Sequence, residues 1–183
     1  MHNQDRCTDA ELVEAACNGD VESFRCLYDR HYRLAIGIAL SRLRDRHLAE
    51  DVAQEAFAIA CRKLHTLSRA NRFPEWFGTI CRRTASKMSS RQVHIEPLQE
   101  QSITDSSCDT DISKNEYVRD AMEKLPLSAR ELLTLHYFSG LSHKEIALVL
   151  GISSQAVHGR LQRARKMLIV HLPNELKKGI SND

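Results

Sequence analysis

Apolar residues recur at intervals of three and four along most of the chain, which is the spacing of one buried face on an α-helix. The pattern is clear near the C-terminus, where Val157, Leu161, Ala164 and Leu168 form a single stripe. The same spacing predicts further helices over residues 8–19, 20–44, 47–66, 74–91, 117–125, 128–138 and 142–150. The chain is therefore expected to be all-α.

Residues 140–168 predict a helix-turn-helix. Ser142 and Glu145 have the spacing of a capping box, which satisfies two unpaired N–H groups where a helix begins. Gly151 suits the left-handed conformation that ends this helix, and Ser153 or Ser154 can cap the next one. The turn between the two helices is therefore about three residues long.

The second helix of this pair has a basic outer surface. No acidic residue lies between Glu145 and Glu175. Arginine and glutamine can bond base edges bidentately in the DNA major groove, while other cations neutralise phosphate. An ordinary helical hairpin with a solvated basic face is the simpler alternative. The polar positions are Gln155, His158, Arg160, Gln162, Arg163, Arg165 and Lys166.

Other capping signals divide the rest of the chain. Thr8 with Glu11, and Ser128 with Glu131, repeat the capping-box spacing and predict two further helix starts. Asp20 is expected to cap the helix over 20–44. Pro74 suits the first turn of a helix, where its missing N–H costs nothing.

Charge is segregated along the chain although the formal net charge is only +2. Residues 72–91 contain five Lys or Arg against one acid, whereas residues 96–116 contain six acids against one Lys. The acidic stretch is rich in Ser, Asp, Gln and Thr, which favours an extended linker. We therefore expect two small helical domains, over 1–92 and 114–175, joined by an acidic flexible linker over 93–113 and followed by a tail over 176–183.

Two surfaces in the first domain carry candidate chemistry. Positions 50, 51, 54 and 55 form an acidic outer face, which by spacing alone is solvated surface. Phe73, Trp76 and Phe77 adjoin a basic loop, and aromatic rings can stack on unpaired bases. Trp76 and Phe77 are expected in the core, which leaves Phe73 as the freer candidate for stacking.

The six cysteines at 7, 17, 26, 61, 81 and 108 show no C-x-x-C spacing, which favours small core residues in a reducing cytosol. A redox or zinc site using Cys61 with His65 or Cys81 is the sharper alternative, but no usual four-ligand zinc pattern is present. No apolar run approaches a membrane span, so no membrane insertion is expected. We expect a cytoplasmic protein that needs no metal and no cofactor.

The order of these parts resembles the bacterial RNA polymerase sigma factors, specifically the extracytoplasmic-function (ECF) group. The best-matching segments are AEDVAQEAF at 49–57, FPEWFGTICRR at 73–83 and LPLSARELLTLHYFSGLSHKEIALVLGISSQAVHGRLQRARKML at 125–168. The resemblance implies an initiation subunit that binds core RNA polymerase and promoter DNA. It also implies an anti-sigma partner that masks both domains.

The resemblance assigns roles to three sets of residues. Binding to the clamp helices of the largest polymerase subunit falls to Glu50, Asp51, Gln54, Glu55 and Phe57. Minus-10 recognition and melting, with capture of a flipped base by the loop 68–73, falls to Arg69, Asn71, Arg72, Phe73, Arg82, Arg83 and Lys87. Minus-35 recognition falls to Ser154, Gln155, His158, Arg160, Gln162, Arg163 and Lys166.

Some positions depart from the family pattern. Arg83 and Lys87 stand where an Asn and an Asp are common, and Ala156 and His158 replace a common Thr and Lys. Base contacts therefore cannot be copied from better-known members.

Two other classes of function remain as alternatives. A stand-alone helix-turn-helix regulator would use the same C-terminal domain without polymerase. A metal-dependent nuclease would be an enzyme, but the chain offers no phosphate-binding loop, no plausible Ser/His/Asp order and no metal-ligand cluster. The expected function is therefore a non-catalytic one.

Overall fold

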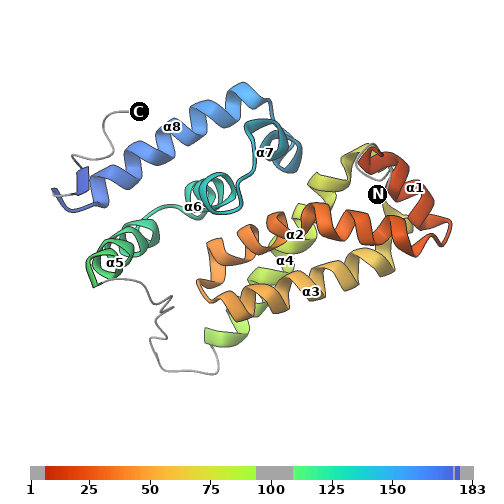
Figure 1. The fold of residues 1–183 in the computed structure, drawn as a ribbon, viewed down its shortest axis with the longest axis horizontal. Coiled ribbons are helices and arrows are strands. Elements are labelled where there is room, and N and C mark those ends of the chain that lie inside the picture. The colour runs from red at the N-terminus through yellow and green to blue at the C-terminus, as the bar shows by residue number, and fades with distance from the viewer. Residues whose placement is uncertain (1–6, 94–108, 175, 178–183) are drawn as a thin grey trace.

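The computed structural model describes residues 7–93, 109–174, 176 and 177, and those residues form helices with no strand among them. The first domain contains α1 (Asp9–Cys17), α2 (Val21–Leu43), α3 (Arg46–Lys63) and α4 (Phe73–Val93). Two short 3₁₀ turns, Leu64–Thr66 and Ala70–Arg72, join α3 to α4. In Figure 1, α2, α3 and α4 run side by side and α1 lies across one end of them.

The ends of these helices are set by side-chain caps. Thr8 and Glu11 form the expected capping box, and Asp20 accepts from the Glu22 N–H at 3.1 Å. Asp45 caps α3 by accepting from the Leu48 N–H at 2.9 Å. The side chain of Asp45 thus starts α3 directly after the end of α2.

The second domain contains α5 (Asp109–Glu123), α6 (Leu127–Leu133), α7 (His143–Leu150) and α8 (Ser154–His171), with a π-helical segment η4 (Thr134–Phe138) after α6. The helix-turn-helix is confirmed in detail. Both halves of the Ser142–Glu145 capping box are present, Gly151 has φ 63°, and Ser153 caps α8. A left-handed glycine therefore sets the turn between the two helices.

The expected capping box at residues 128–131 is wrong. Helix α6 begins two residues earlier than that box requires, and Pro126 occupies its N-cap position without any side-chain cap. Glu131 is instead buried and paired with arginines of the first domain. The Glu131 carboxylate therefore binds these arginines and does not cap the helix.

The second domain begins earlier in the chain than expected. Helix α5 begins at Asp109, inside the segment 93–113 expected to be linker. Residues 94–108 of the expected linker and 178–183 of the tail lie outside the described residues.

The two domains pack against each other along one seam. Helices α2 and α4 contact α6, η4 and α7. Gly37 of α2 allows this approach, because a Cβ built there would meet the hydroxyl of Ser139 and lie 3.1 Å from Leu135 Cδ2. A Cβ on Gly78 of α4 would lie 3.1 Å from Val149 Cγ1. The apolar core runs across this seam without interruption.

Candidate functional site

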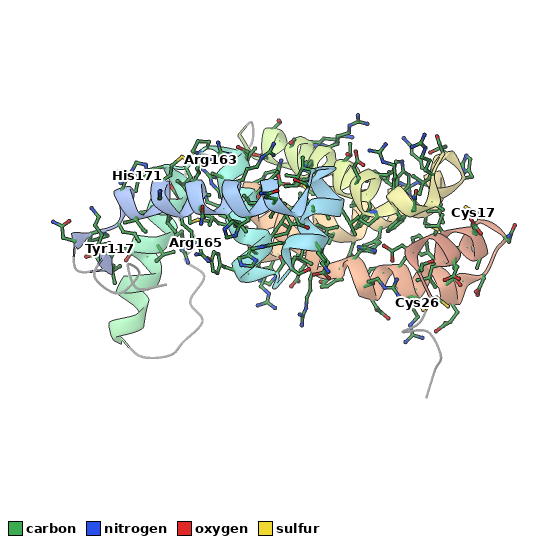
Figure 2. The ribbon with its side chains drawn as sticks, turned by 90° about the horizontal axis from the view of Figure 1, so that it is seen from above. Cys17, Cys26, Tyr117, Arg163, Arg165 and His171 are labelled. Atoms are coloured by element: carbon green, nitrogen blue, oxygen red, sulfur yellow. The ribbon has the colours of Figure 1, made fainter. Side chains whose placement is uncertain are left out.

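Helix α8 presents a basic surface over an apolar stripe. Val157, Leu161 and Ala164 are buried, as the spacing predicts. Ser154 is half-buried, whereas six of the seven predicted DNA-reading positions are exposed. Figure 2 shows this helix with Arg163 and Arg165 labelled along it. The exposed six are Gln155, His158, Arg160, Gln162, Arg163 and Lys166.

A cluster of three histidines joins α8 to the elements before it. The ring of His143 lies 5.1 Å from that of His136 and 5.6 Å from that of His158, between centroids. Burial lowers the pKa of His143, and the charges of His136, His158 and Arg165 lower it further. Protonation of His143 would therefore place positive charges together at the start of α7.

The acidic face of α3 is formed as predicted. Asp51, Gln54 and Glu55 are exposed and Glu50 is half-buried. The pairs of Glu50 with Arg46 at 3.2 Å and of Glu55 with Arg62 at 3.4 Å are both exposed to solvent. Exposed pairs contribute roughly 0–1 kcal/mol, so these carboxylates remain available to a partner.

Phe57 does not belong to this surface. Its side chain is 3% exposed, and its ring centroid lies 4.4 Å from those of Tyr28 and Phe77. The prediction that Phe57 contacts a partner is therefore wrong. Phe57 holds α3 against α2 and α4.

The loop between α3 and α4 lines a surface hollow of about 570 Å³. Arg69, Asn71 and Arg72 are exposed. Arg72 Nη2 lies 2.5 Å from Glu75 Oε2, which holds the loop against the first turn of α4. Half-buried Trp76 contributes an aromatic surface to the same hollow.

Phe73 is a correction to the predicted base-stacking set. It is fully buried and stacks on Phe77 with ring planes 9° apart and centroids separated by 5.5 Å. A ring enclosed in this way cannot stack on a base. The aromatic residue that the hollow offers is Trp76, which the sequence alone had placed in the core.

Helix α4 places basic side chains beside the acidic face of α3. Exposed Arg83 and Lys87 line a hollow of about 450 Å³ together with Asp51 and Glu55. The two surfaces therefore adjoin along one groove, where a protein partner and a nucleic acid could bind next to each other.

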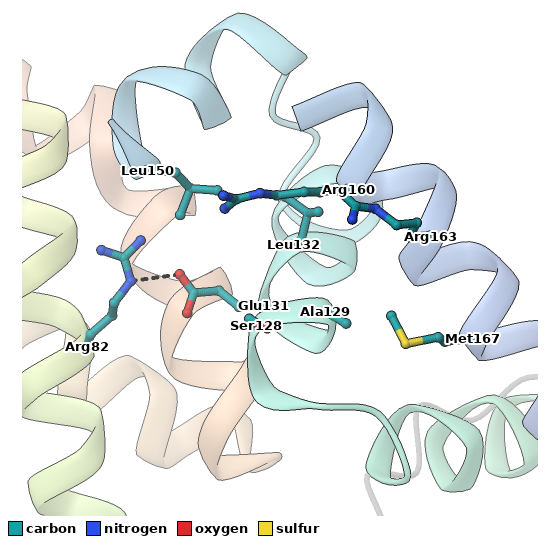
Figure 3. A pocket seen from close by; sticks show the side chains of 9 residues that line it. All are labelled: Arg82, Ser128, Ala129, Glu131, Leu132, Leu150, Arg160, Arg163 and Met167. Atoms are coloured by element: carbon teal, nitrogen blue, oxygen red, sulfur yellow. Dashed lines mark hydrogen bonds and ion pairs between the residues drawn. The ribbon is translucent and has the colours of Figure 1, made fainter. Parts of the chain in front are cut away.

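Arg82 is half-buried, whereas Arg83 and Lys87 of the same helix are exposed. Its Nε donates to Glu131 Oε1 at 2.8 Å, and Arg42 Nη1 donates to Glu131 Oε2 at 2.9 Å. Arg82 and Glu131 also line a hollow of about 420 Å³ that includes Arg160 and Arg163 of α8 (Figure 3). No sequence signal linked Arg42 or Glu131 to Arg82, because these three residues lie far apart in the chain.

The metal or redox site considered for Cys61, His65 and Cys81 is not assembled in the described part of the chain. No group of three or more His, Cys, Asp or Glu there is arranged to hold a metal ion. Cys61 is exposed, whereas Cys81 is buried, and burial raises the pKa of the Cys81 thiol. Within the same residues, no helix is both long and apolar enough to cross a bilayer.

Two family models match the chain without overlap. Residues 27–94 match sigma-70 region 2, and residues 115–168 match sigma-70 region 4. The two matches correspond to the first and second domains of the structure.

Curated relatives match over most of their length. The RNA polymerase sigma-H factor of Pseudomonas aeruginosa is 28% identical over 176 residues, which cover 87% of this chain and 91% of that protein. The ECF RNA polymerase sigma-E factor of Escherichia coli is 27% identical over 180 residues, covering 90% and 94%. The ECF RNA polymerase sigma factor BldN of Streptomyces coelicolor is 29% identical, covering 91% and 67%.

Solved structures share the fold. CnrH in complex with the cytosolic domain of CnrY superposes with a TM-score of 0.59 at 24% identity, covering 94% of this chain and 99% of CnrH. The sigma factor RpoE in complex with the anti-sigma factor NepR from Bartonella quintana gives a TM-score of 0.55 at 22% identity, covering 82% and 97%. At these identities the likeness shows the fold alone.

Proposed function

The chain belongs to the ECF group of sigma-70 factors, which direct promoter-specific initiation by RNA polymerase, and we propose that three of its surfaces divide this work. The acidic face of α3 binds core polymerase, the loop before α4 and the basic side of α4 bind the minus-10 element, and α8 binds the minus-35 element. Nothing in the comparisons favours a stand-alone regulator.

Polymerase binding is assigned to Glu50, Asp51, Gln54 and Glu55, and the proposed partner is the clamp helices of the largest subunit. Support comes from the exposure of Asp51, Gln54 and Glu55 on one face of α3, beside half-buried Glu50, and from the weakness of the ion pairs that engage Glu50 and Glu55. Charges of one sign steer association and fix register more than they add affinity. A basic surface on the polymerase is the chemistry that fits.

Minus-10 recognition is assigned to the hollow between the loop and α4. Arg69 and Arg72 line this hollow, exposed Asn71 lies in the loop between them, Trp76 supplies an aromatic surface, and Arg83 lies on the side of α4. Unpairing a base costs a few kcal/mol, and a pocket that stacks and bonds the flipped base offsets part of that cost. Lys87 extends the basic surface along the displaced strand.

Minus-35 recognition is assigned to the exposed side of α8. The second helix of a helix-turn-helix enters the major groove with its N-terminal residues on base edges. Gln155, His158 and Arg160 are placed for bases, and Gln162, Arg163 and Lys166 for bases or phosphates.

An anti-sigma partner is proposed by analogy with the solved relatives. RpoE of Bartonella quintana was solved with the anti-sigma factor NepR, and CnrH with the cytosolic domain of CnrY. We place the protein in the cytoplasm, where bacterial RNA polymerase works.

The observation that carries the proposal is the shared groove of α3 and α4, which sets acidic side chains beside basic ones. The test is binding of fluorescent protein to purified core polymerase, followed by run-off transcription on a promoter library. The variant Asp51→Lys/Glu55→Lys should lose binding to core polymerase, whereas Arg83→Ala/Lys87→Ala should bind core polymerase normally and open promoters poorly. Equal effects of both variants on core binding would contradict the division of labour.

A further inference from the structure

We propose that Asp9 and His31 are positioning residues for promoter opening: they hold α1 beneath the loop before α4 and so fix the hollow that receives the flipped minus-10 base. The proposal rests on the minus-10 role assigned above to that hollow. It gives α1, to which no DNA-binding or polymerase-binding surface is assigned, a part in the same step.

Helix α1 lies under the connection between α3 and α4. It contacts both 3₁₀ turns of that connection and lies at the end of the first domain where α3 passes into α4 (Figure 1). Leu12 and Val13 of α1 are buried in the core of the domain. Leu67 and Ala70 of the loop are half-buried against the same core. A shift of α1 would therefore move the loop that lines the hollow.

Three contacts in series join α1 to the aromatic surface of the hollow. Asp9 Oδ2 lies 2.9 Å from Nε2 of His31, which is 8% exposed. The His31 ring lies 5.1 Å from that of Phe73, and the Phe73 ring lies 5.9 Å from that of Trp76, between centroids. Trp76 lines the hollow. Because Phe73 is also the first residue of α4, the contact with His31 sets where that helix begins beside the loop.

Histidine suits position 31 because its ring makes two different contacts. Burial acts to raise the pKa of Asp9, but the hydrogen bonds and charges of His31 and Arg30 lower that pKa below its ordinary value. The Asp9 carboxylate is therefore ionised and can only accept, so Nε2 of His31 carries the proton and donates to it. This hydrogen bond fixes the orientation of the ring that packs on Phe73. An apolar side chain of similar size would fill the space without that constraint.

Arg30 holds the same carboxylate from the solvent side and provides a matched control. Its Nη1 donates to Asp9 Oδ1 at 2.6 Å, and its Nη2 donates to the Cys7 carbonyl at 3.0 Å. Arg30 is exposed, whereas His31 is buried against Phe73. Arg30→Gln therefore removes an anchor of α1 but leaves the contact between Asp9 and His31 in place.

Two variants break that contact from opposite sides. His31→Phe keeps an aromatic ring beside Phe73 but removes the donor to Asp9. Asp9→Ala removes the acceptor and leaves the His31 ring in the core. Because both variants remove the same hydrogen bond, the double variant should be no more impaired than the more impaired single variant.

Fluorescence of Trp76 tests the positioning itself, because Trp76 is the only tryptophan of the chain. The emission maximum and the quenching by acrylamide are measured on the full chain without polymerase, at a temperature where circular dichroism shows wild-type helix content. His31→Phe and Asp9→Ala should both shift the emission maximum and change the quenching, while Arg30→Gln should match the wild type. Wild-type fluorescence in both variants would overturn the proposal, because the hollow would then be independent of α1.

Formation of open complexes tests the consequence for function. With core polymerase, 2-aminopurine placed within the minus-10 element of a promoter reports the unpairing of that element. His31→Phe and Asp9→Ala should form open complexes at least about tenfold more slowly than the wild type, since one base stacked on an aromatic ring contributes a factor of roughly that size. Binding to core polymerase and to the minus-35 element should stay normal. Arg30→Gln should open the promoter at the wild-type rate.

Three results would contradict the positioning role. Wild-type opening rates in His31→Phe and Asp9→Ala would remove the link to promoter opening. Equal slowing by Arg30→Gln would mean that any loosening of α1 explains the loss. A matching loss of core-polymerase binding would mean that the defect is one of stability. Failure of the proposed function is distinguishable, because it would appear as absence of protein-dependent starts with the wild-type chain, whereas the fluorescence of Trp76 does not depend on transcription.

Discussion

Phe57 offers a sharp test of the division between core and interface on α3. The side chain is 3% exposed and packs between Tyr28 and Phe77. Truncation of a buried Phe to Ala costs about 3–5 kcal/mol, since it removes apolar burial and leaves a cavity. For a helical domain of this size each kcal/mol lowers the melting temperature by about 4–8 °C. We therefore expect Phe57→Ala to lower the melting temperature of the first domain by about 12 °C or more.

Thermal unfolding followed by far-ultraviolet circular dichroism measures this loss, with Gln54→Ala as the matched control. Gln54 is exposed on the same helix, one turn earlier, and its truncation should change stability by less than about 0.5 kcal/mol. The reasoning fails if Phe57→Ala melts like the wild type and binds core polymerase weakly, because Phe57 would then be an interface residue.

Three further predictions concern surfaces and pH. Asp51→Lys/Glu55→Lys should weaken binding to core polymerase in a fluorescence titration and leave the melting temperature nearly unchanged; a large drop in melting temperature would mean that these side chains are structural. Arg163→Ala should weaken minus-35 binding by about 1–3 kcal/mol if Arg163 makes a bidentate base contact, which DNA titrations with single-base variants measure, and an unchanged base preference would exclude that role. Folding lowers the pKa of His143. The contribution of neutral His143 to the free energy of unfolding is therefore complete above the ordinary pKa of 6.5, and it is lost as the pH falls through the lowered pKa. Denaturant titrations should therefore show a steeper acid loss of stability for the wild type than for His143→Gln, with exposed His65→Gln as the control, and parallel pH profiles would contradict the shift.

The sequence predicted best where its signals are local. A capping box acts within four residues, and a left-handed glycine acts at one, so Ser142, Glu145 and Gly151 were sufficient to place the helix-turn-helix. The apolar stripe of α8 was equally clear, because its period is that of the helix itself.

The errors concern residues whose environment depends on other helices. Phe57 and Phe73 were assigned to surfaces, but both rings are enclosed: Tyr28 of α2 and Phe77 of α4 pack on Phe57, and His31 of α2 packs on Phe73. Glu131 had the spacing of a capping residue, yet two arginines from distant helices hold its carboxylate. Periodicity shows which side of a helix is apolar, but not which neighbouring element covers a residue at the edge of that side.

The most direct test of the account is run-off transcription with purified core RNA polymerase, with and without this protein, on a promoter library whose transcript starts are sequenced. The account predicts starts that depend on the protein and share two upstream elements. It also predicts that Arg163→Ala changes selection at the upstream element and Arg83→Ala/Lys87→Ala lowers opening at the downstream one. DNA binding by the protein alone, with no protein-dependent starts from core polymerase, would contradict it.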